Sequence, residues 1–121
     1  KKSKNGSIIN IGSISGLYPF KGNIAYGSSK AALMFATKVM SKEFADYNIR
    51  VNSVAPSVTN TIMAKLINKK SLNELLKKSK LKKPMSVNEV ADKVLYLASD
   101  KSKTINGKII HTLGDKTWKI I

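Results

Sequence analysis

The hydrophobic residues of this chain fall into short continuous runs, separated by longer segments with helical periodicity. Residues 6–12 (GSIINIG) and 49–55 (IRVNSVA) are apolar runs of strand length, the first bounded by glycines and the second ended by a proline. Residues 25–47 between them are rich in helix formers and contain no proline. Because apolar side chains occupy much of the girth of this predicted helix, we expect the sheet to bury one side and a partner subunit to bury another.

The second half of the chain predicts two more helices and a last strand. Residues 69–84 are rich in lysine, but leucines recur at helical spacing, which predicts an amphipathic helix with a solvated lysine face. Ser86 and Glu89 form a capping box that opens a helix extending to Ser99. Residues 104–112 (TINGKIIHT) then turn at Asn–Gly into a strand.

Apart from the lysine-rich helix, the order is strand, helix, strand, helix, strand, which is typical of parallel crossover units and of the α/β class. We expect one partial domain over residues 1–121, the C-terminal part of a doubly wound parallel sheet in a three-layer α/β/α arrangement. Three strands are few for a sheet whose faces and edges both need cover. The N-terminal strands are therefore expected to be missing and to lie upstream.

Composition adds a strong positive charge. The 121 residues have a formal net charge of +15, which would favour nucleic acid, an anionic membrane or an acidic carrier protein as a partner. Arg50 is the only arginine and few aromatic residues lie among the lysines, so we expect a solvated surface and no nucleic-acid site. The chain has no cysteine and no apolar run of the ~20 residues that span a membrane. A cytoplasmic protein that binds no membrane is the expectation.

Candidate chemistry collects where the predicted strands end. Ser13 follows the first strand, and Tyr26 and Lys30 lie one turn apart at the start of the long helix. Residues 52–61 (NSVAPSVTNT) leave the second strand at its C-terminal end. Open α/β sheets bind ligands at this rim, so we expect the three segments to converge there. In isolation, Tyr26 and Lys30 would more often be a half-buried aromatic and a surface cation.

Taken together, these segments resemble the short-chain dehydrogenase/reductase family. The family's serine and its Tyr-x-x-x-Lys match Ser13, Tyr26 and Lys30 at the usual separation, and its Asn-x-x-x-Pro-Gly-x-x-x-Thr stretch matches residues 52–61 with one exception. The similarity extends over nearly the whole chain and is weakest between residues 63 and 83. It implies a Rossmann-like fold and hydride transfer between NAD or NADP and a carbonyl or secondary alcohol.

The resemblance also implies a role for each catalytic residue. A carbonyl that accepts hydride needs a proton donor at its oxygen, and the reverse reaction needs a base there; this residue would be Tyr26. The ordinary pKa of a tyrosine, about 10, is poorly matched to neutral pH, and a nearby ammonium group, here that of Lys30, favours the phenolate. Ser13 would hydrogen-bond the substrate oxygen, with Ser15 as a competitor for that role.

The cofactor side of the site would combine Tyr26 and Lys30, whose ammonium group holds the nicotinamide ribose in the family, with the loop after the second strand. The loop residues expected to contact the cofactor are Pro56, Ser57, Val58 and Thr61. Ser57 stands where the family has glycine, which matters if the position needs a positive φ. The family's glycine-rich dinucleotide turn, its catalytic asparagine and the residue that selects NAD or NADP belong to the absent upstream half.

The sequence leaves more than one substrate class and assembly possible. A 3-oxoacyl group on a carrier protein is one candidate, since a basic surface suits an acidic carrier, and sugars or other small ketones are equally allowed. The family implies a homodimer or homotetramer. The alternatives are a catalytically incomplete remnant that acts only as an oligomerising partner, and a lysine-rich binder of anionic surfaces or nucleic acid. Lys21 is a weak candidate for substrate contact. His111, the only histidine, is expected to be a core or edge residue and not a metal ligand.

Overall fold

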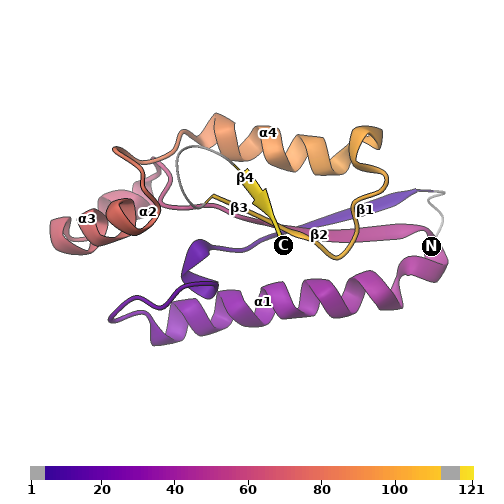
Figure 1. Ribbon diagram of the computed structural model, residues 1–121, viewed down its shortest axis with the longest axis horizontal. Helices are drawn as coiled ribbons and strands as arrows, with labels where there is room; N and C mark the ends of the chain where they lie inside the picture. Colours follow the sequence, from indigo (N-terminus) through magenta and orange to yellow (C-terminus); the bar gives the residue numbers. More distant parts are fainter. Residues whose placement is uncertain (1–4, 113–117) are drawn as a thin grey trace.

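A four-stranded sheet forms the middle layer of the fold (Figure 1). The computed structural model describes residues 5–112 and 118–121. In order across the sheet, the strands are β1 (Gly6–Ile11), β2 (Ile49–Ala55), β3 (Ile109–Thr112) and β4 (Trp118–Ile120). The first three are parallel, and β4 runs antiparallel to β3. The predicted α/β class with a parallel sheet is therefore confirmed.

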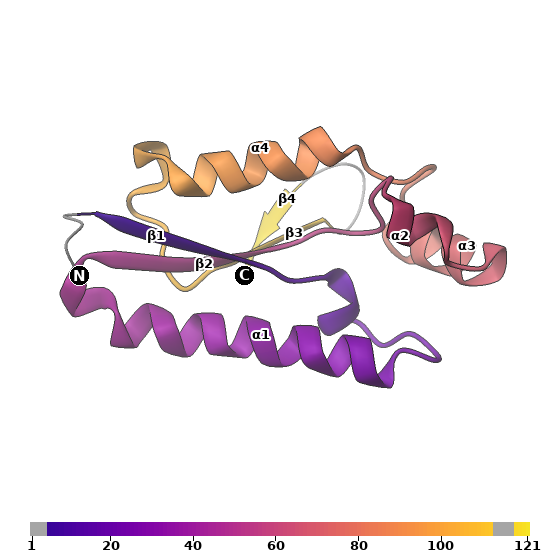
Figure 2. The ribbon, with the colours of Figure 1, turned by 180° about the vertical axis from the view of Figure 1, so that it is seen from behind.

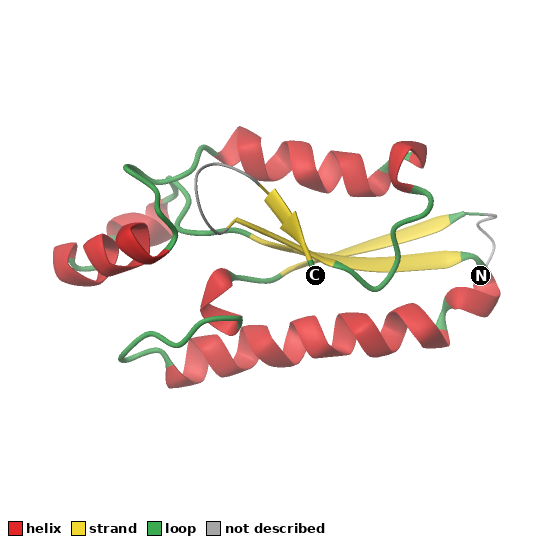
Figure 3. Cartoon of the chain, viewed as in Figure 1, coloured by secondary structure: helices red, strands yellow, loops and turns green. Residues whose placement is uncertain are grey.

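Helices cover both faces of this sheet and the end at which the parallel strands finish. The α-helices are α1 (Ile24–Glu43), α2 (Ile62–Lys65), α3 (Lys69–Lys78) and α4 (Val87–Ala98). Figures 1 and 3 show α1 below the sheet and α4 above it, and the view from behind agrees (Figure 2). The short α2 and α3 lie beyond the C-terminal ends of β1 and β2. This arrangement has the three layers that were predicted.

The core on the α4 side is apolar. Val54 of β2 and Ile110 of β3 are packed with Leu97 of α4, and all three side chains are almost completely buried.

Helix α4 begins as predicted. The Ser86 hydroxyl accepts the backbone N–H of Glu89 at 3.2 Å and satisfies one of the free donors of the first turn. A local cap and an apolar stripe together place α4 on the sheet.

The contact between α1 and the sheet combines a small apolar cluster with buried polar groups. Met34 packs with Ala55 of β2 and Ile109 of β3. Next to this cluster, the Asn10 side-chain amide donates to the hydroxyl of the fully buried Thr37 at 2.9 Å. Because small and polar residues fill this interface, α1 lies close to the strands although its inward face is not strongly hydrophobic.

The outer face of α1, which a partner subunit is expected to bury, is exposed in the single chain. Phe35 is 71% exposed and Val39 is 38% exposed, so the chain itself leaves apolar side chains of this face in solvent.

The helix predicted for residues 25–47 ends earlier, at Glu43, and a 3₁₀ turn follows. Asn48, with φ of 56°, closes that turn in the left-handed conformation that asparagine tolerates.

One further boundary was predicted wrongly, and one strand was not predicted. The helix expected over residues 69–84 ends at Lys78. It cannot continue past Lys80, because that residue adopts a positive φ of 55°. Strand β4 was missed altogether. Its three residues are too few to show a period of two, and their pairing with β3 is a long-range contact.

The entry into β3 is organised by Asn52, the asparagine of the family-like stretch. Its side chain is fully buried, donates to the Ile105 carbonyl at 2.9 Å and accepts the N–H of Lys108 at 2.9 Å. Gly107 has φ of 70°, and a Cβ there would lie 2.5 Å from the Ser41 hydroxyl. The Asn–Gly turn thus leads into a parallel strand, and Asn52 has a structural role.

Arg50, the only arginine, is used inside the fold. Its guanidinium group donates to the carbonyls of Ser102 (3.0 Å), Leu97 (3.1 Å), Ile105 (3.3 Å) and Ser99 (3.4 Å), and also to the Ser102 hydroxyl. These carbonyls belong to the end of α4 and the segment after it, where helical carbonyls lack partners. Arg50 is therefore not presented to a phosphate, which weakens the nucleic-acid alternative.

Candidate active site

The loops that follow β1 and β2 are joined by backbone hydrogen bonds beyond the ends of the strands. The N–H of Gly12 donates to the Val54 carbonyl at 2.7 Å, and the N–H of Ile14 donates to the Pro56 carbonyl at 3.1 Å. Parallel strands end at the same edge of a sheet, so these bonds continue the β1–β2 pairing into the loops. As a result, Ser13 lies next to the loop expected to bind the cofactor.

Ser13 caps a 3₁₀ turn, η1 (Ile14–Gly16), directly after the first strand. Its backbone is extended, and its hydroxyl oxygen accepts the N–H of Ser15 at 3.1 Å. The residue is 8% exposed, and it lines the cleft described below. The hydroxyl of Ser13 retains its own proton for donation to a ligand oxygen. Ser15 also lines the cleft and is less buried.

Tyr26 and Lys30 occupy the first two turns of α1 on one face. The Lys30 ammonium group donates to the Ile11 carbonyl, at the end of β1, at 2.9 Å. The same nitrogen lies 5.7 Å from the centre of the Tyr26 ring, within the range of a cation–π contact. The tyrosine is 43% exposed. The ammonium group is thus held between the strand end and a tyrosine that a ligand can reach.

A single cleft of about 830 Å³ is lined by every residue that the sequence analysis assigned to the site. These residues are Ser13, Tyr26, Lys30, Pro56, Ser57, Val58 and Thr61. They come from the N-cap of η1, from α1 and from the loop between β2 and α2, which are separated in the sequence. The weak candidate Lys21 also lines the cleft and is exposed.

Two of the expected cofactor-binding residues have structural contacts as well. The hydroxyl of Ser57, which is 5% exposed, donates to the Ser79 hydroxyl at 2.9 Å and so connects the loop to the end of α3. Ser57 is not among the described residues with positive φ, so serine fits where the family has glycine. The Thr61 hydroxyl accepts the N–H of Ala64 at 3.3 Å and caps α2.

The apolar wall of the cleft was not predicted from the sequence. It comes from the loop before α1 and from α2, α3 and α4, and includes Phe20, Met63, Ile67, Leu75, Val87 and Val90. The periodicity of α3 and α4 marks some of these side chains as inward-facing. It could not show that they face a cleft, because that depends on where the helices lie relative to the sheet.

His111 lies outside the cleft lining, in β3. It is 3% exposed, its ring centre is 6.4 Å from that of Tyr18, and its Nδ1 is a buried polar atom without a hydrogen-bond partner within the described chain. Burial, and the positive charge of Lys119 on β4, hold the pKa of His111 below its ordinary value.

In the described ranges, no group of three or more histidine, cysteine, aspartate or glutamate residues could hold a metal ion. No helix in residues 5–112 is both long and apolar enough to traverse a bilayer.

The chain is similar to known proteins over nearly its whole length, and the match identifies its family. The family model described as "Enoyl-(Acyl carrier protein) reductase" matches residues 1–114. The chain therefore belongs to the short-chain dehydrogenase/reductase family.

Individual relatives are reductases and dehydrogenases. The chain is 39% identical to 3-oxoacyl-[acyl-carrier-protein] reductase FabG of Thermotoga maritima over 90% of this chain and 44% of the relative. It is 37% identical to a 2,5-dichloro-2,5-cyclohexadiene-1,4-diol dehydrogenase of Sphingobium indicum, over 88% of this chain and 42% of the relative. The crystal structure of 3-oxoacyl-[acyl-carrier protein] reductase from Brucella melitensis is similar, with a TM-score of 0.81 and 28% identity, over 92% of this chain and 42% of that one. The chain thus spans less than half the length of these proteins.

Proposed function

We propose that these residues form the catalytic half of a NAD(P)(H)-dependent oxidoreductase that interconverts a carbonyl group and a secondary alcohol. The observation that carries the proposal is the convergence of Ser13, Tyr26 and Lys30 on one cleft together with the loop after β2. Family membership supports it, because the two named relatives and the solved structure carry reductase or dehydrogenase names.

The proton in this reaction would move at Tyr26. In the reducing direction, the Tyr26 hydroxyl gives its proton to the substrate oxygen as the carbonyl carbon receives hydride; in the oxidising direction the phenolate takes that proton back. The ammonium group of Lys30 lies 5.7 Å from the centre of the tyrosine ring and is the cation nearest to this proton transfer in the proposed site. Ser13 donates its hydroxyl proton in a hydrogen bond to the same oxygen and orients it.

The cleft suits the nicotinamide end of a dinucleotide. Its volume of about 830 Å³ lies within the ~300–1,000 Å³ range of small-molecule sites. Lys30 presents a donor for ribose hydroxyls, and Pro56 to Val58 and Thr61 form the wall along which the carboxamide and pyrophosphate would lie. When bound, the dinucleotide supplies or accepts the hydride. Nothing in the described residues selects NAD over NADP.

For the substrate, we propose a 3-oxoacyl group carried as a thioester on a carrier protein. The apolar wall contributed by Phe20, Met63 and Ile67 suits an acyl chain better than a sugar. The names of the Thermotoga and Brucella proteins point to the same substrate, whereas that of the Sphingobium dehydrogenase shows that relatives of this likeness accept different alcohols.

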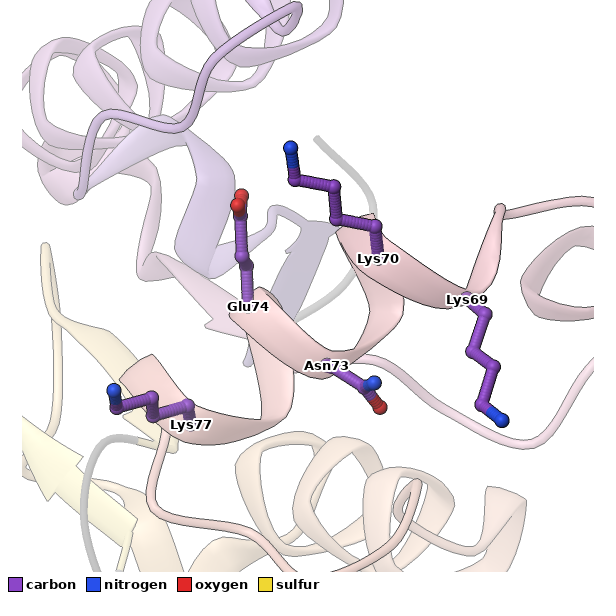
Figure 4. A pocket seen from close by; sticks show the side chains of 5 residues that line it. All are labelled: Lys69, Lys70, Asn73, Glu74 and Lys77. Atoms are coloured by element: carbon purple, nitrogen blue, oxygen red, sulfur yellow. The ribbon is translucent and has the colours of Figure 1, made fainter.

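The basic surface near the cleft is consistent with an acidic carrier. Residues 62–83 include eight lysines and one acidic residue. Figure 4 shows side chains of α3 that line a shallow hollow, with Lys69 and Lys77 extending away from the helix on different sides. All the lining residues of this hollow belong to one helix and are exposed, so we assign it no ligand. The lysine face serves here as a charged surface.

The assembly and location are part of the same proposal. The exposed apolar side chains on the outer face of α1, Phe35 foremost, support a homodimer or homotetramer in which a second copy covers this face. A cytoplasmic location stays a prediction.

Replacement of Tyr26 by phenylalanine tests the proposed chemistry. The variant should lower kcat for reduction of a 3-oxoacyl thioester with NADPH or NADH by at least ~10²-fold, because the proton donor is lost. We expect folding to be preserved, since the ring is 43% exposed. The measurement is oxidation of the reduced nicotinamide by the full-length protein, followed by absorbance.

The matched control is Tyr96→Phe, which removes the same atom from a tyrosine of α4 that does not line the cleft. Its activity should equal that of the parent. An active parent with an equally active Tyr26→Phe variant would refute the assigned role. A full-length protein that binds neither NADH nor NADPH would favour the catalytically incomplete alternative.

A further inference from the structure

The turn that holds Ser13 packs directly on the helix that holds Tyr26 and Lys30. A Cβ atom added to Gly16, the last residue of η1, would lie 2.7 Å from the backbone nitrogen of Ala31 and 2.9 Å from the carbonyl carbon of Lys30. Real Cβ atoms are essentially never found within 3.0 Å of another heavy atom outside their own local chain. The two backbones therefore approach as closely as they do because Gly16 has no side chain.

A second glycine makes the same contact from the side of the helix. Gly27 is buried in the first turn of α1, and a Cβ there would lie 2.7 Å from the carbonyl oxygen of Ser15. In both cases the atoms that would collide include backbone atoms, which cannot turn aside as a side chain can. By contrast, a Cβ on Gly12 would meet side-chain atoms of Met34 and Ser53.

We infer that Gly16 and Gly27 are positioning residues that set the place of the Ser13 hydroxyl relative to Tyr26 and Lys30. This inference rests on the proposed function, in which Ser13 and Tyr26 bind one substrate oxygen. Neither glycine lines the cleft, so neither acts by contact with a ligand. Both act by allowing η1 and α1 to lie close together. Gly16 is in the turn that follows Ser13, and Gly27 lies between Tyr26 and Lys30 in α1.

A methyl group at either position would push η1 away from α1. Ser13 would move with the turn, because it caps η1 through its hydrogen bond with Ser15. The hydroxyls of Ser13 and Tyr26 must both hydrogen-bond the substrate oxygen, so their relative position tolerates little displacement. A misplacement of about 1 Å can lower the rate by about 10²-fold. We therefore expect Gly16→Ala to lower kcat by about 10²-fold.

A double-mutant cycle separates positioning from a general loss of structure. The variants are Gly16→Ala, Ser13→Ala and the two combined, each made in the full-length protein and assayed for reduction of a 3-oxoacyl thioester. If Gly16 acts by placing the serine hydroxyl, its replacement should cost about 10²-fold in kcat in the parent and only a few-fold once that hydroxyl is gone. Equal losses in both backgrounds, or no loss in the parent, would overturn the inference.

Ala32→Ser is the matched control, because it adds one heavy atom to α1 at an exposed position. Its kcat should stay within about twofold of the parent. A crystal structure of Gly27→Ala supplies a readout that needs no activity: the Ser15 carbonyl and Ser13 should be displaced relative to Tyr26. A structure that superimposes on the parent at Ser13 and Tyr26 would overturn the inference, whereas an inactive parent would count only against the proposed function.

Discussion

Replacement of Arg50 should destabilise the protein far more than loss of a surface cation. The guanidinium group lies under the end of α4 and donates to carbonyls of α4 and of the segment that leads to β3. In Arg50→Met the carbonyls of Leu97 and Ser102 lose their charged donor, at 3.1 and 3.0 Å respectively, and keep only neutral donors. The loss should loosen the end of α4 and its connection to β3.

The magnitude follows from the two short hydrogen bonds. A hydrogen bond to a charged group contributes a net ~1.5–3 kcal/mol, and the longer bonds from Arg50, at 3.3 and 3.4 Å, are near the geometric limit. Two bonds at the lower value give a loss of about 3 kcal/mol in the free energy of unfolding. Arg50→Lys keeps the charge but not the planar arrangement of donors, and should lose about half as much.

The assay is equilibrium unfolding in urea by the full-length protein, with Lys101→Met as the matched control. Lys101 is an exposed cation of the 3₁₀ turn after α4, and its replacement should change the stability by no more than ~0.5 kcal/mol. If Arg50→Met proves no more destabilising than Lys101→Met, the hydrogen bonds of Arg50 do not hold α4 to β2, and the reasoning is refuted.

Two further predictions concern the core. Leu97→Ala should cost ~2–5 kcal/mol in urea unfolding because the side chain is fully buried, whereas Leu95→Ala, at a 69% exposed position of the same helix, should cost less than ~0.5 kcal/mol; similar losses would contradict the described packing. His111 has a lowered pKa in the folded state, so the unfolded chain binds more protons near the ordinary histidine pKa, and stability should fall as the pH is lowered through that value. Thermal unfolding of His111→Leu should show a smaller fall than the parent; an unchanged fall would assign the pH dependence to other groups.

Features that depend on neighbouring residues could be predicted from the sequence alone. The strands β1 and β2 are continuous apolar runs that end at turn residues. The start of α4 follows from Ser86, which directly precedes the helix and whose hydroxyl accepts the N–H of Glu89. The convergence of Ser13, Tyr26 and Lys30 was also predictable, because parallel strands bring the segments after them to one edge of a sheet.

Features that depend on contacts between distant segments were decided by the tertiary structure. Strand β4 exists through its pairing with β3, and Asn52 is buried because it bridges β2 to the segment before β3. The apolar wall of the cleft depends on where α2 and α3 lie, which no local period specifies. The close approach of η1 to α1 at Gly16 and Gly27 is likewise invisible in the sequence, since a glycine shows that a side chain is absent but not which backbone occupies its space.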